Sequence, residues 1–171
     1  MWPKSDRTRF ETLVRAYSAD LYRFAYWLTR ERSLAEDLVQ ECFARAWKHL
    51  DQLQNEQAAK HWLFSIVRNE HARLYAKPRA ERDTCELEDA HEIAAPMLSI
   101  PASLAVNQAL DHLPLSHREP LLLQVLGGFS CAEIGTMLAL SETNVMARVS
   151  RARRVLRELL DPADTLLERT S

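Results

Sequence analysis

Apolar side chains recur at helical spacing in three stretches of the N-terminal half of the chain, and each stretch predicts a helix. The stretches cover residues 8–29, 34–53 and 61–75. In the second stretch, the apolar positions fall within half of a helical wheel, which is the pattern of a helix that faces a core. These positions are Leu38, Val39, Cys42, Phe43, Ala46, Trp47, Leu50 and Leu53. In the third stretch, Trp62, Ile66 and Val67 are expected to pack inward, so the pattern predicts a lobe of three long helices.

The C-terminal third of the chain repeats the signals that begin helices. A serine followed three residues later by a glutamate is typical of a capping box, and this pair occurs at Ser116 and Ser130, as it does at Ser33 in the first lobe. Ser141 is placed as a further N-cap. The helix after Ser141 is basic and follows a short helix after Ser130. Two helices joined by a short turn, the second of them basic, indicate a helix-turn-helix.

Charge is distributed unevenly along the chain. Residues 1–82 carry 15 Lys and Arg against 11 Asp and Glu, and residues 112–171 carry seven of each. Residues 83–111 carry six acids and no Lys or Arg, contain two prolines and lack a sustained apolar period, as expected of a linker. We therefore predict an all-α protein of two small helical domains, residues 4–80 and 107–161, joined by a flexible acidic linker over residues 81–106.

Composition is consistent with this picture. A chain of 171 residues is long enough for one full domain or two small ones, and its three glycines favour helices over sheets. No stretch approaches the ~18 to 20 apolar residues that cross a bilayer, so no direct membrane insertion is expected. The N-terminus lacks the apolar core of a signal peptide, which predicts a cytoplasmic protein.

Residues with catalytic or metal-binding potential form no recognisable site in the sequence. The three cysteines stand far apart without a C-x-x-C pair, which favours reduced thiols. Cys85 and His91 offer only two of the four ligands that a structural metal site normally needs. Phosphate-binding, dinucleotide-binding and nucleophile-elbow motifs are absent. We therefore predict no catalytic residue, no metal and no cofactor, and a protein that is not itself an enzyme.

The basic segment at residues 141–157 has two contrasting faces on a helical wheel. Val145, Val149, Ala152 and Leu156 form a narrow apolar stripe. The opposite arc consists of Thr143, Asn144, Ala147, Ser150, Arg151 and Arg154. After its first two residues the segment contains no acid, whereas a solvated helix usually intersperses Glu with Arg. Short polar side chains followed by arginines suit a helix that enters the major groove, which favours DNA binding over a merely solvated face.

Three segments together resemble an extracytoplasmic-function (ECF) sigma factor of the sigma-70 family. They are "AEDLVQECFARAW", "HWLFSIVRN" and the stretch from "LPLSHREP" to "RRVLR", and the resemblance runs from about Phe10 to Leu160. It implies two helical domains, region two and region four, that bind RNA polymerase core and direct transcription initiation at promoters. It also implies an anti-sigma factor as a partner, and a linker that runs through the RNA exit path of the polymerase. The composition of the linker is equally compatible with a solvated tether.

The resemblance assigns roles within region two. Asp37, Gln40 and Glu41 match the positions that grip the clamp helices of the β′ subunit, and the helical wheel places them on the exposed face. Asn69 matches a position that contacts a base of the −10 element, and residues 52–60 match the loop that captures a flipped base. The side chains expected to hold phosphates of this strand are Arg68, Arg73, Lys77 and Arg79.

The resemblance also assigns the −35 element to the basic helix of region four. The residues expected to contact this element are Thr143, Asn144, Ala147, Arg148, Arg151 and Arg154. The chain departs from the family at Met146, where Lys or Arg is usual, and at Thr143 and Ala139, where Gly is usual. Ala139 lacks the permissive backbone that the turn often uses.

Two other functions are compatible with parts of the pattern. A stand-alone transcriptional regulator would use the same helix-turn-helix, with the N-terminal lobe as a partner or dimerisation module. A decoy would bind polymerase without engaging promoters. The "DLVQE" string argues against the regulator, and the basic helix argues against the decoy.

Overall fold

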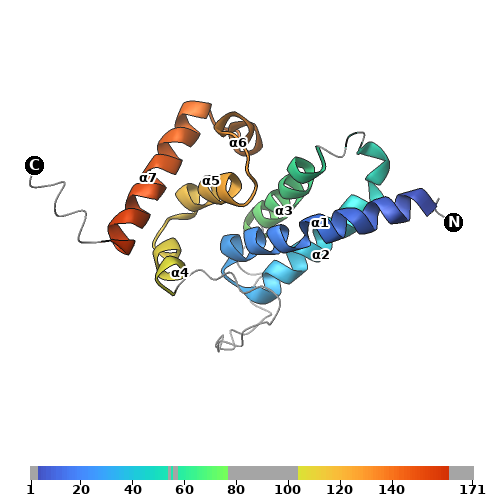
Figure 1. Cartoon of the computed structure of the whole chain (residues 1–171), viewed down its shortest axis with the longest axis horizontal. Helices are drawn as coiled ribbons and strands as arrows, with labels where there is room; N and C mark the ends of the chain where they lie inside the picture. Colours follow the sequence, from blue (N-terminus) through green and yellow to red (C-terminus); the bar gives the residue numbers. More distant parts are fainter. Residues whose placement is uncertain (1–3, 54, 56–57, 77–103, 162–171) are drawn as a thin grey trace, which may run out of the picture. The chain divides into compact units, whose positions relative to one another are not determined.

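The computed structural model describes residues 4–53, 55, 58–76 and 104–161, and within them every regular element is helical (Figure 1). The all-α prediction is therefore confirmed. The chain divides at residues 98 and 99 into two compact units, which are described separately.

The first unit is built from α1 (Lys4–Thr29), α2 (Arg32–Lys48), a short 3₁₀ turn η1 (Leu50–Gln52) and α3 (Ala59–Ala76). Each of the three α-helices packs against the other two. Phe24 of α1 and Phe64 of α3 are completely buried, and their ring centroids lie 5.1 Å apart. Side chains of this size bury enough apolar area to hold the bundle together.

The predicted apolar face of α2 lies on the core side of this bundle. Of the eight predicted positions, the buried ones are Leu38, Cys42, Ala46, Leu50 and Leu53. The helix predicted to continue to residue 53 ends at Lys48, so Leu50 lies in η1 and Leu53 directly follows it. Phe43 and Trp47 are half-buried and pack edge to face on Phe10, at centroid distances of 6.1 and 4.9 Å. Trp62 packs against a smaller apolar cluster beside η1, so its expected inward position is confirmed.

The junction between α1 and α2 differs from the prediction of a capping box at Ser33. The helix α2 begins at Arg32 with Glu31 as its N-cap, and no side chain caps it. Ser33 lies inside the first turn, where its hydroxyl donates to the Glu31 carboxylate at 3.0 Å. The chain reverses too early for Ser33 to cap, because Arg30 adopts a left-handed φ of 57° directly after α1.

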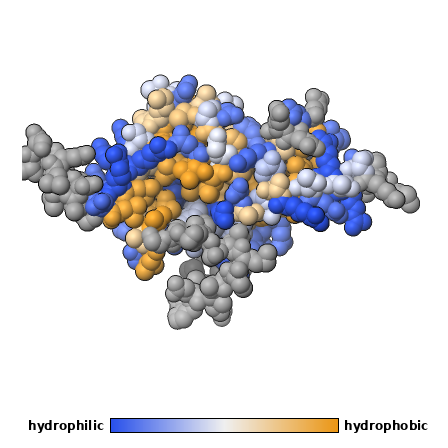
Figure 2. All heavy atoms as spheres, in the orientation of Figure 1, coloured by the Kyte–Doolittle hydropathy of each residue, from blue (hydrophilic) through white to orange (hydrophobic). Residues whose placement is uncertain are grey.

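The second unit contains α4 (Leu104–Asp111), α5 (Leu115–Val125), α6 (Cys131–Leu138) and α7 (Glu142–Leu160). The helices α4, α5 and α6 all pack on α7. The helix α4 begins at Leu104, within the last residues of the predicted linker 81–106, and buries Ala109 and Leu110. The rest of the predicted linker, residues 81–103, lies outside the described part of the chain. Figure 2 shows apolar residues gathered where α4 meets the C-terminal end of α7, away from the α6–α7 turn.

Two of the predicted helix starts in this unit are confirmed. Ser130 and Glu133 form the reciprocal hydrogen bonds of a capping box, at 3.2 and 2.8 Å, and Ser141 caps α7 by accepting from the amide of Asn144 at 3.2 Å. The prediction at Ser116 is wrong, because Pro114 precedes α5 as its N-cap and Ser116 falls within the first turn.

The turn between α6 and α7 is tight. Gly135 of α6 permits it, since a Cβ there would meet the carbonyl oxygen of Leu140 at 2.7 Å. Ala139 ends α6 in the left-handed conformation, with φ of 54°. This is the conformation in which helices commonly place glycine.

Candidate nucleic-acid and polymerase interfaces

The apolar stripe of α7 faces the other helices of its unit. Val145, Val149 and Ala152 are buried, as the wheel predicts. This burial fixes the rotation of α7 and turns the opposite arc outward. The exposed members of that arc are Thr143, Asn144, Ala147, Ser150, Arg151 and Arg154. The structure therefore brings five of the six residues expected at the −35 element onto one exposed face.

Arg148, the sixth of these residues, is only half-exposed because its guanidinium turns toward its own unit. Its Nε donates to the Asn144 side-chain oxygen at 2.8 Å. One of its terminal nitrogens donates to the backbone carbonyl of Ser116, at the start of α5, at 3.4 Å. Sequence reasoning treated Arg148 as another DNA-facing arginine and missed this pair of bonds.

Arg154 has an acidic neighbour on the same helix. Its Nε lies 3.9 Å from the Glu158 carboxylate, and both side chains are largely exposed. An exposed pair of this kind contributes little to stability, so Arg154 can exchange Glu158 for a phosphate at little cost.

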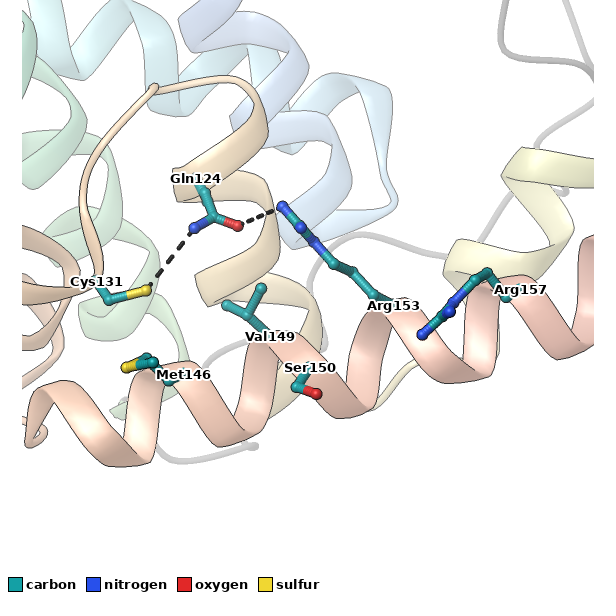
Figure 3. Close-up of a pocket in the computed structure, with 7 residues that line it drawn as sticks. All are labelled: Gln124, Cys131, Met146, Val149, Ser150, Arg153 and Arg157. Carbon is teal, nitrogen blue, oxygen red and sulfur yellow. Dashed lines mark hydrogen bonds between the residues drawn. The ribbon is translucent and has the colours of Figure 1, made fainter.

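A groove of about 240 Å³ borders the exposed arc on the side of α5 and α6. Figure 3 shows the Gln124 amide at the groove, with its nitrogen 3.8 Å from the Cys131 sulfur and its oxygen accepting from Arg153 at 2.6 Å. Arg153 is thereby directed toward α5 and away from the exposed arc. The remaining residues of the groove are Met146, Val149, Ser150 and Arg157.

A second groove, of about 480 Å³, lies between α2 and α3 in the first unit. Asp37, Gln40 and Glu41, the residues expected to bind the polymerase, are exposed and line it together. Two side chains of α3, Glu70 and Leu74, complete the wall, and sequence reasoning missed them. The other lining residues are Leu34, Leu38 and Ala44.

An ion-pair network joins the two walls of this groove. Arg45 of α2 lies 2.8 Å from the Glu41 carboxylate and 3.0 Å from the Glu70 carboxylate, and Arg73 lies 3.3 Å from the same Glu70 oxygen. The Glu70 side chain is only 13% exposed, so this carboxylate is screened less than the others. The network fixes the spacing of the two helices beside the groove.

Three of the residues expected at the −10 element lie on α3. Asn69 and Arg73 are exposed, and Arg68 is half-exposed. Lys77 and Arg79 lie outside the described residues. The predicted capture loop at residues 52–60 begins in η1 and ends in the first turn of α3, and only part of it is described.

The described residues contain no group of three or more His, Cys, Asp and Glu side chains that could hold a metal ion. Cys85 and His91 lie outside the described part of the chain. Cys42 is buried, and burial raises the pKa of its thiol to about 12. A neutral, buried thiol is a poor nucleophile, so Cys42 serves the core. Among the described helices, none is long and apolar enough to span a membrane.

Comparison with known proteins assigns a family to each unit. The family model of sigma-70 region 2 matches residues 13–80, and that of sigma-70 region 4 matches residues 103–156. ECF RNA polymerase sigma factor EcfG of Rhodopseudomonas palustris is 34% identical, over 92% of this chain and 87% of its own length. ECF RNA polymerase sigma factor SigL of Mycobacterium tuberculosis is 32% identical, over 82% of each chain.

Solved structures give the same assignment. The sigma factor RpoE of Bartonella quintana, in complex with the anti-sigma factor NepR, matches with a TM-score of 0.70 and 29% identity, over 92% of this chain and 98% of its own. CnrH, in complex with the cytosolic domain of CnrY, matches with a TM-score of 0.65 and 28% identity, over 92% of this chain and 90% of its own. The chain therefore belongs to the ECF RNA polymerase sigma factors, with sigma-70 region 2 in its first unit and region 4 in its second.

Proposed function

We propose that this sigma factor uses three separate surfaces in promoter-specific initiation. The groove between α2 and α3 binds RNA polymerase core, the exposed side of α3 engages the −10 element, and the exposed arc of α7 reads the −35 element. Sigma factors are regulatory subunits without catalytic activity of their own, so each surface acts by binding.

The single observation that carries the proposal is the exposed arc of α7. Burial of the apolar stripe fixes the rotation of α7 about its axis. On the exposed arc, short side chains then lie at the N-terminal end of the helix and arginines lie farther along. Thr143, Asn144 and Ala147 are small enough to let the helix approach base edges in the major groove. Arg151 and Arg154 then lie where phosphates flank the groove, and Arg148 supports the same surface.

The −10 surface is proposed from α3. Asn69 is exposed and offers an amide that can pair with a base edge, and the neighbouring cations Arg68 and Arg73 can hold the phosphates of one strand. Lys77 and Arg79 extend this series in the sequence. Unstacking a base costs a few kcal/mol, so a polar pocket that receives it is a physical requirement of melting. We assign this role to the loop at residues 52–60.

The groove between α2 and α3 is proposed as the polymerase site. It combines exposed acids with apolar side chains from both helices, which suits a partner helix that presents cations and an apolar stripe. Asp37, Gln40 and Glu41 are the polar contacts, and the clamp helices of the β′ subunit are the expected occupant. Glu70 would add a further carboxylate to this site.

Regulation and location are proposed from the relatives. The two solved structures described above are complexes, RpoE with the anti-sigma factor NepR and CnrH with the cytosolic domain of CnrY. We propose that this chain is likewise held by an anti-sigma factor until promoters are needed. A protein that serves RNA polymerase acts in the cytoplasm, and we assign it there.

The test is a fluorescence-anisotropy titration of labelled promoter DNA near physiological salt, with and without core polymerase. The whole chain has a net charge of −2, and sequence-independent affinity grows with the number of phosphates neutralised. We therefore expect weak binding alone and tight, sequence-specific binding with core. Specific binding by the protein alone at ~10 nM or tighter, together with no effect of core, would contradict the proposed division of surfaces.

A further inference from the structure

The guanidinium of Arg148 is committed to groups of its own domain. It donates to the Asn144 side-chain oxygen at 2.8 Å and to the Ser116 carbonyl at 3.4 Å. Arg151, one turn farther along α7, is exposed by comparison. Hydrogen bonds from a charged donor are among the stronger ones, and the first of the two has ideal length. Arg148 therefore has a defined position before any DNA arrives.

A proline explains why the Ser116 carbonyl is available to Arg148. In α5 the carbonyl of residue 116 would normally accept from the amide of residue 120, but residue 120 is Pro120, which has no N–H. A carbonyl near the start of a helix that loses its intrahelical donor needs another partner. Arg148 supplies it, so α5 anchors the side chain that contacts Asn144.

The bond from Arg148 also fixes which end of the Asn144 amide faces outward. An arginine has only donors, so the atom that faces it must be the amide oxygen of Asn144. The amide NH₂ is then directed to the remaining side, and Asn144 itself is exposed. Asn144 lies in the first turn of α7, the part of a recognition helix that contacts base edges.

We propose that Arg148 is a positioning residue that presents Asn144 to the −35 element as a hydrogen-bond donor, so that this sigma factor selects guanine over adenine at the base Asn144 contacts. This inference rests on the proposed role of α7. An unconstrained asparagine pairs with adenine, because its oxygen accepts from N6 while its NH₂ donates to N7. Guanine presents two acceptors, N7 and O6, in the same place, which suits an amide whose oxygen is turned toward Arg148 and whose NH₂ is turned outward.

The experiment measures base preference at each −35 position with holoenzyme assembled from the full chain and core polymerase. A duplex pool randomised across the −35 region is first selected by the wild type, and the selected sequence is then varied one base pair at a time. The variants are Asn144→Ala, Arg148→Met and the double substitution. Arg151→Met serves as a comparison that removes one positive charge from the same helix without a bond to Asn144.

We expect Asn144→Ala to reduce the preference for guanine by roughly 5- to 150-fold at one position. Arg148→Met frees the amide oxygen, so the preference at that same position should shift toward adenine. In the Asn144→Ala background, Arg148→Met should have no further effect there. The salt slope should be unchanged by Arg148→Met, whereas Arg151→Met should reduce it by about one and weaken all sequences alike.

Three results would overturn the inference. A wild-type preference for adenine at the Asn144 position would contradict the donor role of the amide. A uniform loss for Arg148→Met, with a salt slope lower by about one, would make Arg148 a phosphate contact. Additive effects of the two substitutions would show that the residues act independently.

Two further measurements keep the result interpretable. Circular dichroism checks that Arg148→Met folds, and if it does not, Arg148→Ala removes the same two bonds with the best helix-forming residue, so the same shift toward adenine is expected. If neither Asn144→Ala nor Arg151→Met alters binding to any −35 sequence, the proposed role of α7 itself fails. That outcome is distinct from a failure confined to Arg148.

Discussion

Ala139 gives a direct test of the α6–α7 turn, because we predict that Ala139→Gly stabilises region 4. Ala139 has a φ of 54°, where the Cβ of an L-residue costs ~1 to 2 kcal/mol. Glycine avoids this cost but loses ~0.5 to 1 kcal/mol more conformational entropy on folding. The methyl group of Ala139 is exposed, so its removal sacrifices no burial. The expected net gain is therefore ~0.5 to 1 kcal/mol.

The distribution of tryptophan allows this gain to be assigned to one domain. All four tryptophans lie within the first 62 residues, so their fluorescence reports unfolding of the first unit alone, whereas far-ultraviolet circular dichroism reports both units. A gain of 1 kcal/mol raises the Tm of a domain of this size by ~4 to 8 °C. The dichroism transition of region 4 should shift upward, and the fluorescence transition should stay in place.

Two control substitutions test the reasoning about the backbone. Ala132→Gly changes an exposed alanine within α6, where helical backbone is required, and should destabilise region 4 by ~0.5 to 1 kcal/mol. Gly128 has a φ of 69° and open space around its Cβ direction, so Gly128→Ala should destabilise through backbone strain alone. If Ala139→Gly lowers stability as Ala132→Gly does, Ala139 is not held in the left-handed conformation and the reasoning fails.

The remaining predictions concern region 2. The double substitution Gln40→Ala, Glu41→Ala should weaken co-purification with core polymerase. The control Glu36→Ala, which changes an exposed acid of α2 outside the groove, should not. Equal co-purification of the wild type, the double variant and the control would remove this face from the interface. Asn69→Ala should reduce permanganate reactivity of the −10 region on duplex templates more than on pre-melted ones, and an equal loss on both would argue against a role in melting. Burial raises the thiol pKa of Cys42 from its ordinary value of 9.0 to about 12, so its contribution to the free energy of unfolding is complete below about pH 9 and is lost progressively as the pH rises to 12. Fluorescence-detected stability should therefore fall more steeply between pH 9 and 12 in the wild type than in Cys42→Ala, and parallel curves would contradict this.

The sequence predicted most of the helices because burial has a regular period in them. Leu38, Cys42 and Ala46 are separated by one helical turn each, so the core face of α2 could be read directly. Helix starts were less predictable. Ser130 caps α6, but Ser33 does not cap α2, because the chain turns at the left-handed Arg30 and the helix begins two residues earlier than predicted, with Glu31 as its N-cap.

Some residues of the candidate site could likewise be placed from the sequence, and others could not. The rotation of α7 followed from its apolar stripe, so the exposed positions of Asn144 and Arg151 were predictable. The inward turn of Arg148 was not, because it depends on a carbonyl of another helix. Glu70 was missed for a related reason: its place in the groove arises from how α3 packs on α2 and not from spacing within either helix.

The arrangement around Arg45 has a consequence for how the α2 surface can change partners. Arg45 is shared by Glu41 and Glu70, so a cation that approaches Glu41 competes for one carboxylate without leaving Arg45 unpaired. Breaking a partly buried ion pair is normally unfavourable because one charge is left without a partner in a poorly solvated place. Here Arg45 keeps Glu70 as a partner, so that penalty does not arise. Because Glu70 remains paired with Arg45, the Glu41 carboxylate can dissociate from Arg45 and bind it again reversibly. Under the proposed role of this surface, contacts that exchange in this way let the sigma factor bind and leave core polymerase without an unpaired arginine.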